Sequence, residues 1–160
     1  MFDGRFKSEI ERYVRPVGES LRRTGLSPDH FTVLGLCVAG AAAVAIGAGK
    51  MQLGLLLVIC SALPDLLDGA LAKASNSASQ RGAFFDSVVD RVSDSLLFGG
   101  VAWFYASSNS PQFSIVPFAI LGASLIISYE RAKAESLGLY AKGGLMERAE
   151  RIILLCFGLL

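Results

Sequence analysis

Residues 65–90 read DLLDGALAKASNSASQRGAFFDSVVD, and the interpretation of the whole chain starts from this stretch. It places four carboxylates, Asp65, Asp68, Asp86 and Asp90, inside two of the most apolar segments of the sequence. Ionisable side chains are costly within a membrane, and where they occur there they are functional by default. The stretch therefore predicts a carboxylate site carried by two membrane-embedded helices.

The spacing of the four carboxylates indicates a metal site. Asp65 and Asp68 are three residues apart, and Asp86 and Asp90 are four apart, so each pair lies on one face of its helix. Carboxylates that share a small volume repel one another unless cations bind between them, and oxygen ligands favour Mg²⁺ or Mn²⁺. We expect one or two such ions. The alternatives are that the carboxylates pair with nearby basic residues or line the ion path of a transporter.

Glycine and lysine residues in the same stretch suit a large anionic ligand. Gly69 directly follows Asp68, and Gly82 precedes Asp86 by four residues, so both leave the backbone open to close approach. Lys73 lies about one helical turn beyond Gly69 and can reach a phosphate. The pattern favours metal-assisted phosphoryl chemistry over a pore.

The composition is that of a membrane protein. Of the 160 residues, 52% are hydrophobic and 18% are charged, whereas soluble domains carry about 25% charged residues. The net charge is +1, and the basic residues cluster in a few segments without forming a basic face. We therefore expect membrane lipid around the chain and no nucleic-acid partner.

Apolar segments on both sides of the stretch predict an all-α integral membrane helical bundle. The segments long enough to cross a bilayer, or nearly so, are residues 31–49, 51–71, 83–106 and 113–129. Small residues in the first of them would let a neighbouring helix approach closely. A last apolar run begins at Ile152 and stops at Leu160. We expect this run to be either the start of a fifth span in a truncated chain or a segment at the interface. Residues 1–160 are expected to form a single membrane domain.

Residues 2–23 have apolar side chains at three- and four-residue spacing and basic residues between them. This pattern predicts an amphipathic helix in the membrane interface. Six basic residues precede the first span, two lie in the loop between the second and third spans, and five lie in or beside the loop after the fourth. The positive-inside bias places these segments, and with them the carboxylate site, on the cytoplasmic side of the cell membrane.

The stretch resembles the signature of the CDP-alcohol phosphotransferases. Written in that form it is Asp65-x2-Asp68-Gly69-x2-Ala72-Lys73-x8-Gly82-x3-Asp86-x3-Asp90, and it departs from the family pattern at Lys73, where the family usually has Arg. The resemblance implies a six-span bundle, of which this chain covers four spans and the start of a fifth. It also implies that Asp65, Asp68 and Asp86 bind metal, and that Asp90 is the general base and a further metal ligand.

The resemblance extends to the segments that would bind the two substrates. Residues 25–32 are similar to the family segment that helps to hold the CDP group. The expected contacts to CDP-diacylglycerol are Asp29, His30, Phe31, Thr32, Gly69, Lys73 and Ser79. Residues 128–135 and 143–151 resemble the bacterial phosphatidylinositol phosphate synthases, whose matching cations bind the acceptor phosphate. Here those cations are Arg131, Lys133 and Arg151, with Arg131 and Lys133 interchanged relative to the usual order and Ala149 in place of a usual Pro.

The reaction implied by the resemblance is transfer of a phosphatidyl group from CDP-diacylglycerol to inositol 1-phosphate. Its products are CMP and phosphatidylinositol phosphate, and two Mg²⁺ or Mn²⁺ ions would assist. The resemblance and the small-residue faces also predict a homodimer. Asp94, one turn beyond Asp90, extends the acidic face, and we expect it to support the site or to pair with Arg91.

Three alternatives remain open on the sequence. A phosphatidylglycerol phosphate synthase would use glycerol 3-phosphate in the same chemistry, since both acceptors carry a phosphate. A non-enzymatic ion transporter would use the carboxylates as an acidic path. An aspartate-rich membrane prenyltransferase fits the pattern less well at Gly69, Gly82 and Asp90.

Overall fold

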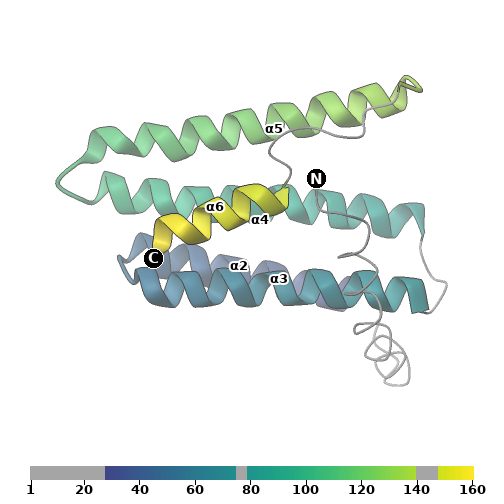
Figure 1. Ribbon diagram of the computed structural model, residues 1–160, viewed down its shortest axis with the longest axis horizontal. Coiled ribbons are helices and arrows are strands. Elements are labelled where there is room, and N and C mark those ends of the chain that lie inside the picture. Colours follow the sequence, from purple (N-terminus) through teal and green to yellow (C-terminus); the bar gives the residue numbers. More distant parts are fainter. Residues whose placement is uncertain (1–27, 75–78, 140–147) are drawn as a thin grey trace. The chain divides into compact units, whose positions relative to one another are not determined.

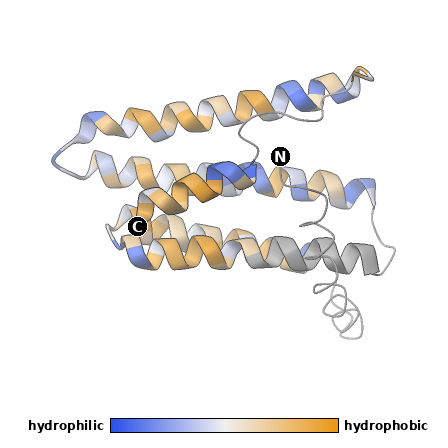
Figure 2. Cartoon of the chain, viewed as in Figure 1, coloured by the Kyte–Doolittle hydropathy of each residue, from blue (hydrophilic) through white to orange (hydrophobic). Residues whose placement is uncertain are grey.

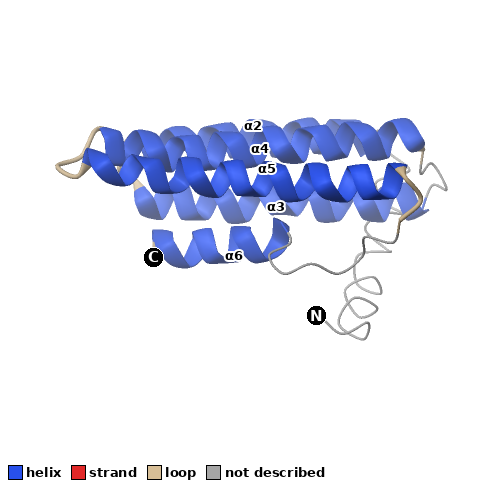
Figure 3. Ribbon diagram, turned by 90° about the horizontal axis from the view of Figure 1, so that it is seen from above, coloured by secondary structure: helices blue, strands red, loops and turns tan. Residues whose placement is uncertain are grey.

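All regular structure in the described part of the chain is helical. The structure, a computed structural model, describes residues 28–74, 79–139 and 148–160, and it describes Pro28 and residues 63–74 as backbone only. Helices alone occur within these ranges (Figure 3), which confirms the all-α fold. The predicted interfacial helix over residues 2–23 lies outside the described residues.

Each predicted apolar segment corresponds to a helix (Figure 1). The helices are α2 (Pro28–Gly47), α3 (Met51–Ala74), α4 (Gln80–Ala106), the 3₁₀-helix η1 (Pro111–Ser114), α5 (Ile115–Ser136) and α6 (Arg148–Leu159). Several of them extend beyond the apolar run that predicted them. In α5 the helix continues through the charged residues 130–135, because no glycine or proline occurs between Tyr129 and Gly138.

Glycines with positive φ end two of the helices. Gly49 has φ +76° after α2, where the N–H of Lys50 donates to the carbonyl of Ala45 and the N–H of Gly49 to that of Ile46, both at 2.9 Å. Gly138, with φ +74°, closes α5 by the same pair of bonds. This arrangement satisfies carbonyls at the helix end and requires a left-handed residue that glycine adopts without strain.

The described contacts divide into two compact units. One takes in Ile59–Val92 and the described residues up to Val38, and the other takes in Ala39–Val58 and Ser93–Leu160. The second unit has a buried core in which α6 packs against segments of α2, α3 and α4. Its fully buried large side chains are Ile46, Val58 and Leu97.

A close backbone approach joins α2 and α4 within this core. A methyl group added at Gly100 would lie 2.5 Å from the carbonyl oxygen of Ala43 and 2.8 Å from its Cα atom. Small residues at helix contacts permit such approaches in membrane proteins. The expectation that small residues of the first span admit a neighbouring helix is confirmed at Ala43.

Two described helices are long and apolar enough to cross a membrane: Asp29–Gly47, and Pro111–Ser136, which joins η1 to α5. Figure 2 shows the apolar length of α5 and the hydrophilic residues near its C-terminal end. Large apolar side chains of α5, among them Ile115, Phe118 and Ile126, are exposed. Such exposure is expected of a helix whose surroundings are lipid. In α3 and α4 the apolar character is interrupted by the carboxylates of the predicted site.

Candidate active site

The predicted carboxylates lie on two helices. Asp65 and Asp68 fall within α3, whose backbone is helical from Met51 to Ala74, so their three-residue spacing places them on one face. Their side chains, and those of Gly69 and Lys73, lie outside the described part of the structure. The helical placement that the spacing predicted is therefore present in α3.

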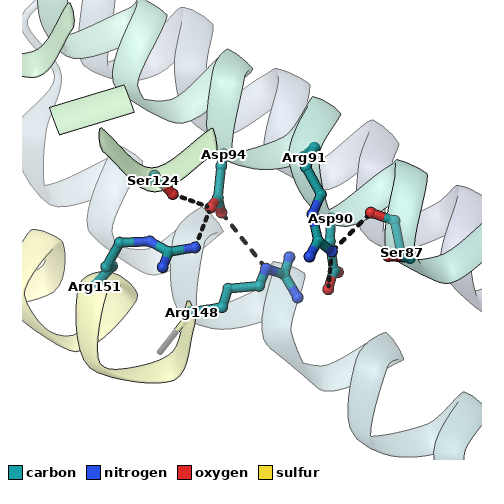
Figure 4. Close-up of polar contacts among 7 residues, drawn as sticks. All are labelled: Ser87, Asp90, Arg91, Asp94, Ser124, Arg148 and Arg151. Atoms are coloured by element: carbon teal, nitrogen blue, oxygen red, sulfur yellow. Dashed lines mark hydrogen bonds and ion pairs between the residues drawn. The ribbon is translucent and has the colours of Figure 1, made fainter. Parts of the chain in front are cut away.

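Asp86 and Asp90 are one turn apart on α4, and both are half-buried. Oδ2 of Asp90 lies 3.7 Å from Nη1 of Arg91. The same Nη1 donates a 2.8 Å hydrogen bond to the backbone carbonyl of Ser87 one turn earlier (Figure 4). The side chains of Arg91 and Asp90 remain 38% and 21% exposed, and so accessible a pair contributes little to stability. The Asp90 carboxylate is thus partly exposed beside Arg91.

Ser79 caps α4 and thereby orients its first turn. The N–H of Gly82 donates to Oγ of Ser79 at 3.0 Å, and the N–H of Ala83 donates to the Ser79 carbonyl at 3.0 Å. A serine in this position satisfies N–H groups that a helix start otherwise leaves without partners. A methyl group at Gly82 would lie 3.2 Å from that Oγ. Gly82 therefore makes room for the cap in addition to the ligand approach expected from the sequence.

The predicted nucleotide contacts at the start of α2 differ in exposure. Asp29 and His30 are exposed in the first turn, Phe31 is half-buried, and Thr32 is 4% exposed. An acidic residue is favoured in a first turn by the helix dipole. Asp29 and His30 are accordingly the members of this group that solvent or a ligand can reach.

The predicted acceptor-binding cations occupy two different environments. Arg131 and Lys133 are exposed near the end of α5. Arg131 Nε lies 3.4 Å from Oε1 of Glu135, one turn further along, and these side chains are 45% and 55% exposed. Arg151 on α6, in contrast, is 8% exposed. Arg151 is therefore a buried cation, and it has a buried partner.

That partner is Asp94 of α4, which is 3% exposed. Nη2 of Arg151 donates to Oδ2 of Asp94 at 2.8 Å, and Oγ of Ser124 lies 3.4 Å from the same oxygen. Nε of Arg148 lies 3.5 Å from Oδ1 of Asp94. Figure 4 shows these side chains converging on Asp94 from α4, α5 and α6. We call these four residues the Asp94 cluster.

The Asp94 cluster corrects the expectation that Asp94 pairs with Arg91, and it brings in Ser124 as a further contact. The contacts of Asp94 are with Arg151, Arg148 and Ser124, while Arg91 contacts Ser87 and Asp90. Ser124 was not predicted as a site residue. The only sequence signal for it was a hydroxyl within an apolar span, and such hydroxyls are common in membrane helices.

No group of three His, Cys, Asp or Glu side chains within the described ranges could hold a metal ion. The predicted metal site takes half of its carboxylates from α3, where only the backbone is described. Its remaining described ligands are Asp86 and Asp90, two hard oxygen donors one turn apart. Such donors fit a Mg²⁺- or Mn²⁺-type ion.

The described part of the chain is all-helical, with the carboxylates Asp86 and Asp90 one turn apart on α4 and, in the other unit, a buried group of cations around Asp94. Residues 26–157 match the CDP-alcohol phosphatidyltransferase family. The chain belongs to that family, whose members are membrane-bound transferases. Family membership decides against the ion-transporter and prenyltransferase alternatives.

The chain is similar to proteins from several bacteria. An uncharacterized protein of Aquifex aeolicus is 38% identical over 151 residues, which are 94% of this chain and 77% of that protein. The phosphatidylinositol phosphate synthase of Mycobacterium marinum is 36% identical over 154 residues, 95% of this chain. The chain spans 66% of the length of that synthase.

Crystal structures of the phosphatidylinositol phosphate synthase of Mycobacterium tuberculosis resemble this fold. The structure with CDP-DAG bound has a TM-score of 0.84 at 36% identity, covering 92% of this chain and 75% of that one. The structure in complex with manganese and citrate has a TM-score of 0.83 at the same identity and covers 91% of this chain and 70% of that one.

Proposed function

We propose that this protein is a phosphatidylinositol phosphate synthase of the cell membrane. The observation that carries the proposal is its 36% identity, over 95% of its length, to a synthase of that name. The substrates would be CDP-diacylglycerol and inositol 1-phosphate. The carboxylate pairs on α3 and α4 and the cations on α5 and α6 supply the two kinds of group that this chemistry needs.

In the proposed reaction the acceptor hydroxyl attacks the β-phosphorus of CDP-diacylglycerol. A P–O bond forms to the acceptor, the P–O bond to CMP breaks, and CMP leaves with the electron pair. Asp90 accepts the proton of the attacking hydroxyl, a role that requires an accessible carboxylate within hydrogen-bond reach. Its partial exposure on α4 is compatible with this role.

Asp65, Asp68, Asp86 and Asp90 would hold the divalent metal, with two ions proposed. A divalent cation bound there supplies charge stabilisation for the pyrophosphate and the departing CMP. The manganese in a homologous structure supports a divalent ion of this kind. Asp29, His30, Phe31, Thr32, Gly69, Lys73 and Ser79 are the proposed contacts to CDP-diacylglycerol.

The acceptor phosphate would bind Arg131, Lys133 and Arg151. Guanidinium groups suit a phosphate because their planar N–H donors can make two parallel hydrogen bonds to it. The proposal further places the active site on the cytoplasmic face of the plasma membrane, from the distribution of basic residues. It also includes a homodimer, which cross-linking in native membranes would test.

The experiment is a transfer assay with purified protein, CDP-diacylglycerol in detergent micelles, Mg²⁺ and labelled inositol 1-phosphate. We expect release of CMP and formation of labelled phosphatidylinositol phosphate. EDTA should stop the reaction, and added Mg²⁺ or Mn²⁺ should restore it. If the protein used only glycerol 3-phosphate in a parallel assay, the proposed acceptor would be wrong and the transfer chemistry of the family would still hold.

A further inference from the structure

The Asp94 cluster contains a buried carboxylate that the proposed reaction does not use. Asp94 is 3% exposed, and its carboxylate would repel the phosphate of an acceptor because like charges disfavour each other. It lies one helical turn beyond Asp90, the proposed base, on the same helix. Its three contacts come from α5 and α6. Asp94 is therefore placed to act through the groups that it contacts.

Asp94 contacts its two arginines through different atoms. Oδ2 receives the terminal Nη2 of Arg151 at 2.8 Å, whereas Oδ1 faces Nε of Arg148 at 3.5 Å. A guanidinium has five N–H donors in a rigid plane, so a contact at one nitrogen fixes the direction of the others. Asp94 thus restrains the plane of Arg151 through a hydrogen bond and faces Arg148 through a longer ion pair.

Burial makes this orientation firm. The side chains of Asp94 and Arg151 are 4% and 9% exposed, whereas that of Arg148 is 30% exposed. The cluster is therefore closed at Asp94 and more open at Arg148. The charge-assisted hydrogen bond between Arg151 and Asp94 is short and directional, and removing one partner of such a buried pair is costly. Ser124 adds a contact from α5 at 3.4 Å that restrains the same carboxylate.

We propose that Asp94 is a positioning residue that holds the guanidinium planes of Arg151 and Arg148 in the orientation that binds the phosphate of the acceptor alcohol. The inference rests on the proposed function, since it assumes a phosphorylated acceptor. It adds Asp94, Ser124 and Arg148 to acceptor recognition. Asp94 touches neither substrate and acts through the two arginines.

The test compares KM values for labelled inositol 1-phosphate and for CDP-diacylglycerol in Asp94→Asn, which keeps the shape of the side chain and removes its charge. The KM for inositol 1-phosphate should rise by about tenfold or more, as loss of an outer partner does at other preorganised sites. The KM for CDP-diacylglycerol should change by less than about twofold, because Asp94 acts on the acceptor site alone. Uniform structural damage would instead move both KM values.

Two further variants keep the test decisive if Asp94→Asn folds poorly. Ser124→Ala removes the weaker restraint and should raise the acceptor KM by about threefold. Arg151→Lys keeps the charge but loses the planar fork. It should raise the acceptor KM as Asp94→Asn does, and the double variant should add little, as expected of residues that act as one unit. Glu130→Gln, at an exposed carboxylate of α5, is the matched control for carboxylate-to-amide change, with both KM values unchanged.

All variants are measured well below their melting temperatures. Equal changes in the two KM values, or a lowered kcat with the acceptor KM unchanged, would overturn the positioning role and leave the proposed function standing. A wild-type protein that transfers nothing to inositol 1-phosphate would overturn the proposed function itself, and this inference with it. Additive effects of Asp94→Asn and Arg151→Lys would also contradict it.

Discussion

The two compact units of this protein differ in how their described side chains are used. In the unit formed by Ala39–Val58 and Ser93–Leu160, a buried core and the Asp94 cluster join segments of α2, α3, α4, α5 and α6. In the other unit, Val89 is the one buried hydrophobic side chain among the described residues, and Asp86 and Asp90 are half-buried. The unit with the Asp94 cluster is thus stabilised by internal packing, whereas the unit with Asp86 and Asp90 carries the carboxylates of the proposed metal site, partly exposed. Substitutions should therefore separate stability from activity.

The largest expected effect is the loss of activity in Asp90→Asn. An amide cannot accept the proton of the attacking hydroxyl, so CMP release should fall by about 10²- to 10⁴-fold. Loss of the pair with Arg91 should itself cost no more than about 1 kcal/mol, because that pair is partly exposed. CMP release and thermal unfolding in detergent measure the two quantities. Near-normal turnover in a folded Asp90→Asn protein would remove Asp90 from the mechanism.

The next effect is on stability, in Arg151→Ala. Removing this side chain leaves Asp94 buried beside a weaker partner, and breaking a buried pair costs about 3–5 kcal/mol. Denaturant-induced unfolding in detergent measures the free energy, with Arg131→Ala as the control. The exposed Arg131–Glu135 pair should contribute only about 0–1 kcal/mol. Equal destabilisation by the two substitutions would show that burial does not distinguish these pairs.

Two neighbouring glycines of α4 test whether packing holds the second unit together. Gly100→Ala introduces a methyl group 2.5 Å from the backbone oxygen of Ala43, and overpacking of this kind costs about 1–3 kcal/mol. Gly99 has no atom within 4 Å of the added methyl position. Gly99→Ala should be neutral or stabilise the helix by up to about 1 kcal/mol. Unfolding curves that coincide for the two variants would contradict the close contact between α2 and α4.

The smallest effect is expected for Glu135→Gln. The carboxylate of Glu135 is more than half exposed and faces Arg131 one turn away on the same helix, a geometry that contributes about 0.3–0.5 kcal/mol. CMP release and the melting temperature should both match the wild type within error. A marked loss of either would show that the exposed pair of Glu135 and Arg131 contributes to stability or activity as strongly as a buried pair does.

Much of the fold was predictable because apolar periodicity and helix breakers act locally. The residues after the apolar run lengthened α3 and α5 beyond the predicted ends, and in α5 it is Gly138 and not Tyr129 that decides the end. The paired carboxylates were predictable for the same reason, since three- and four-residue spacing is a property of one helix. The dual role of Ser79, as a cap of α4 and a proposed nucleotide contact, was not visible in the spacing.

The sequence by itself determined the helices, the faces that carry Asp65, Asp68, Asp86 and Asp90, and the resemblance to a family that the comparisons confirm. Only the tertiary structure decided that Asp94 meets Arg151, 57 residues away, and that Ser124 joins them. The physical reason is that a charged residue's partner depends on which helices pack together. Arg151 is buried and so becomes a fixed part of a network, whereas Arg131 stays exposed on the surface.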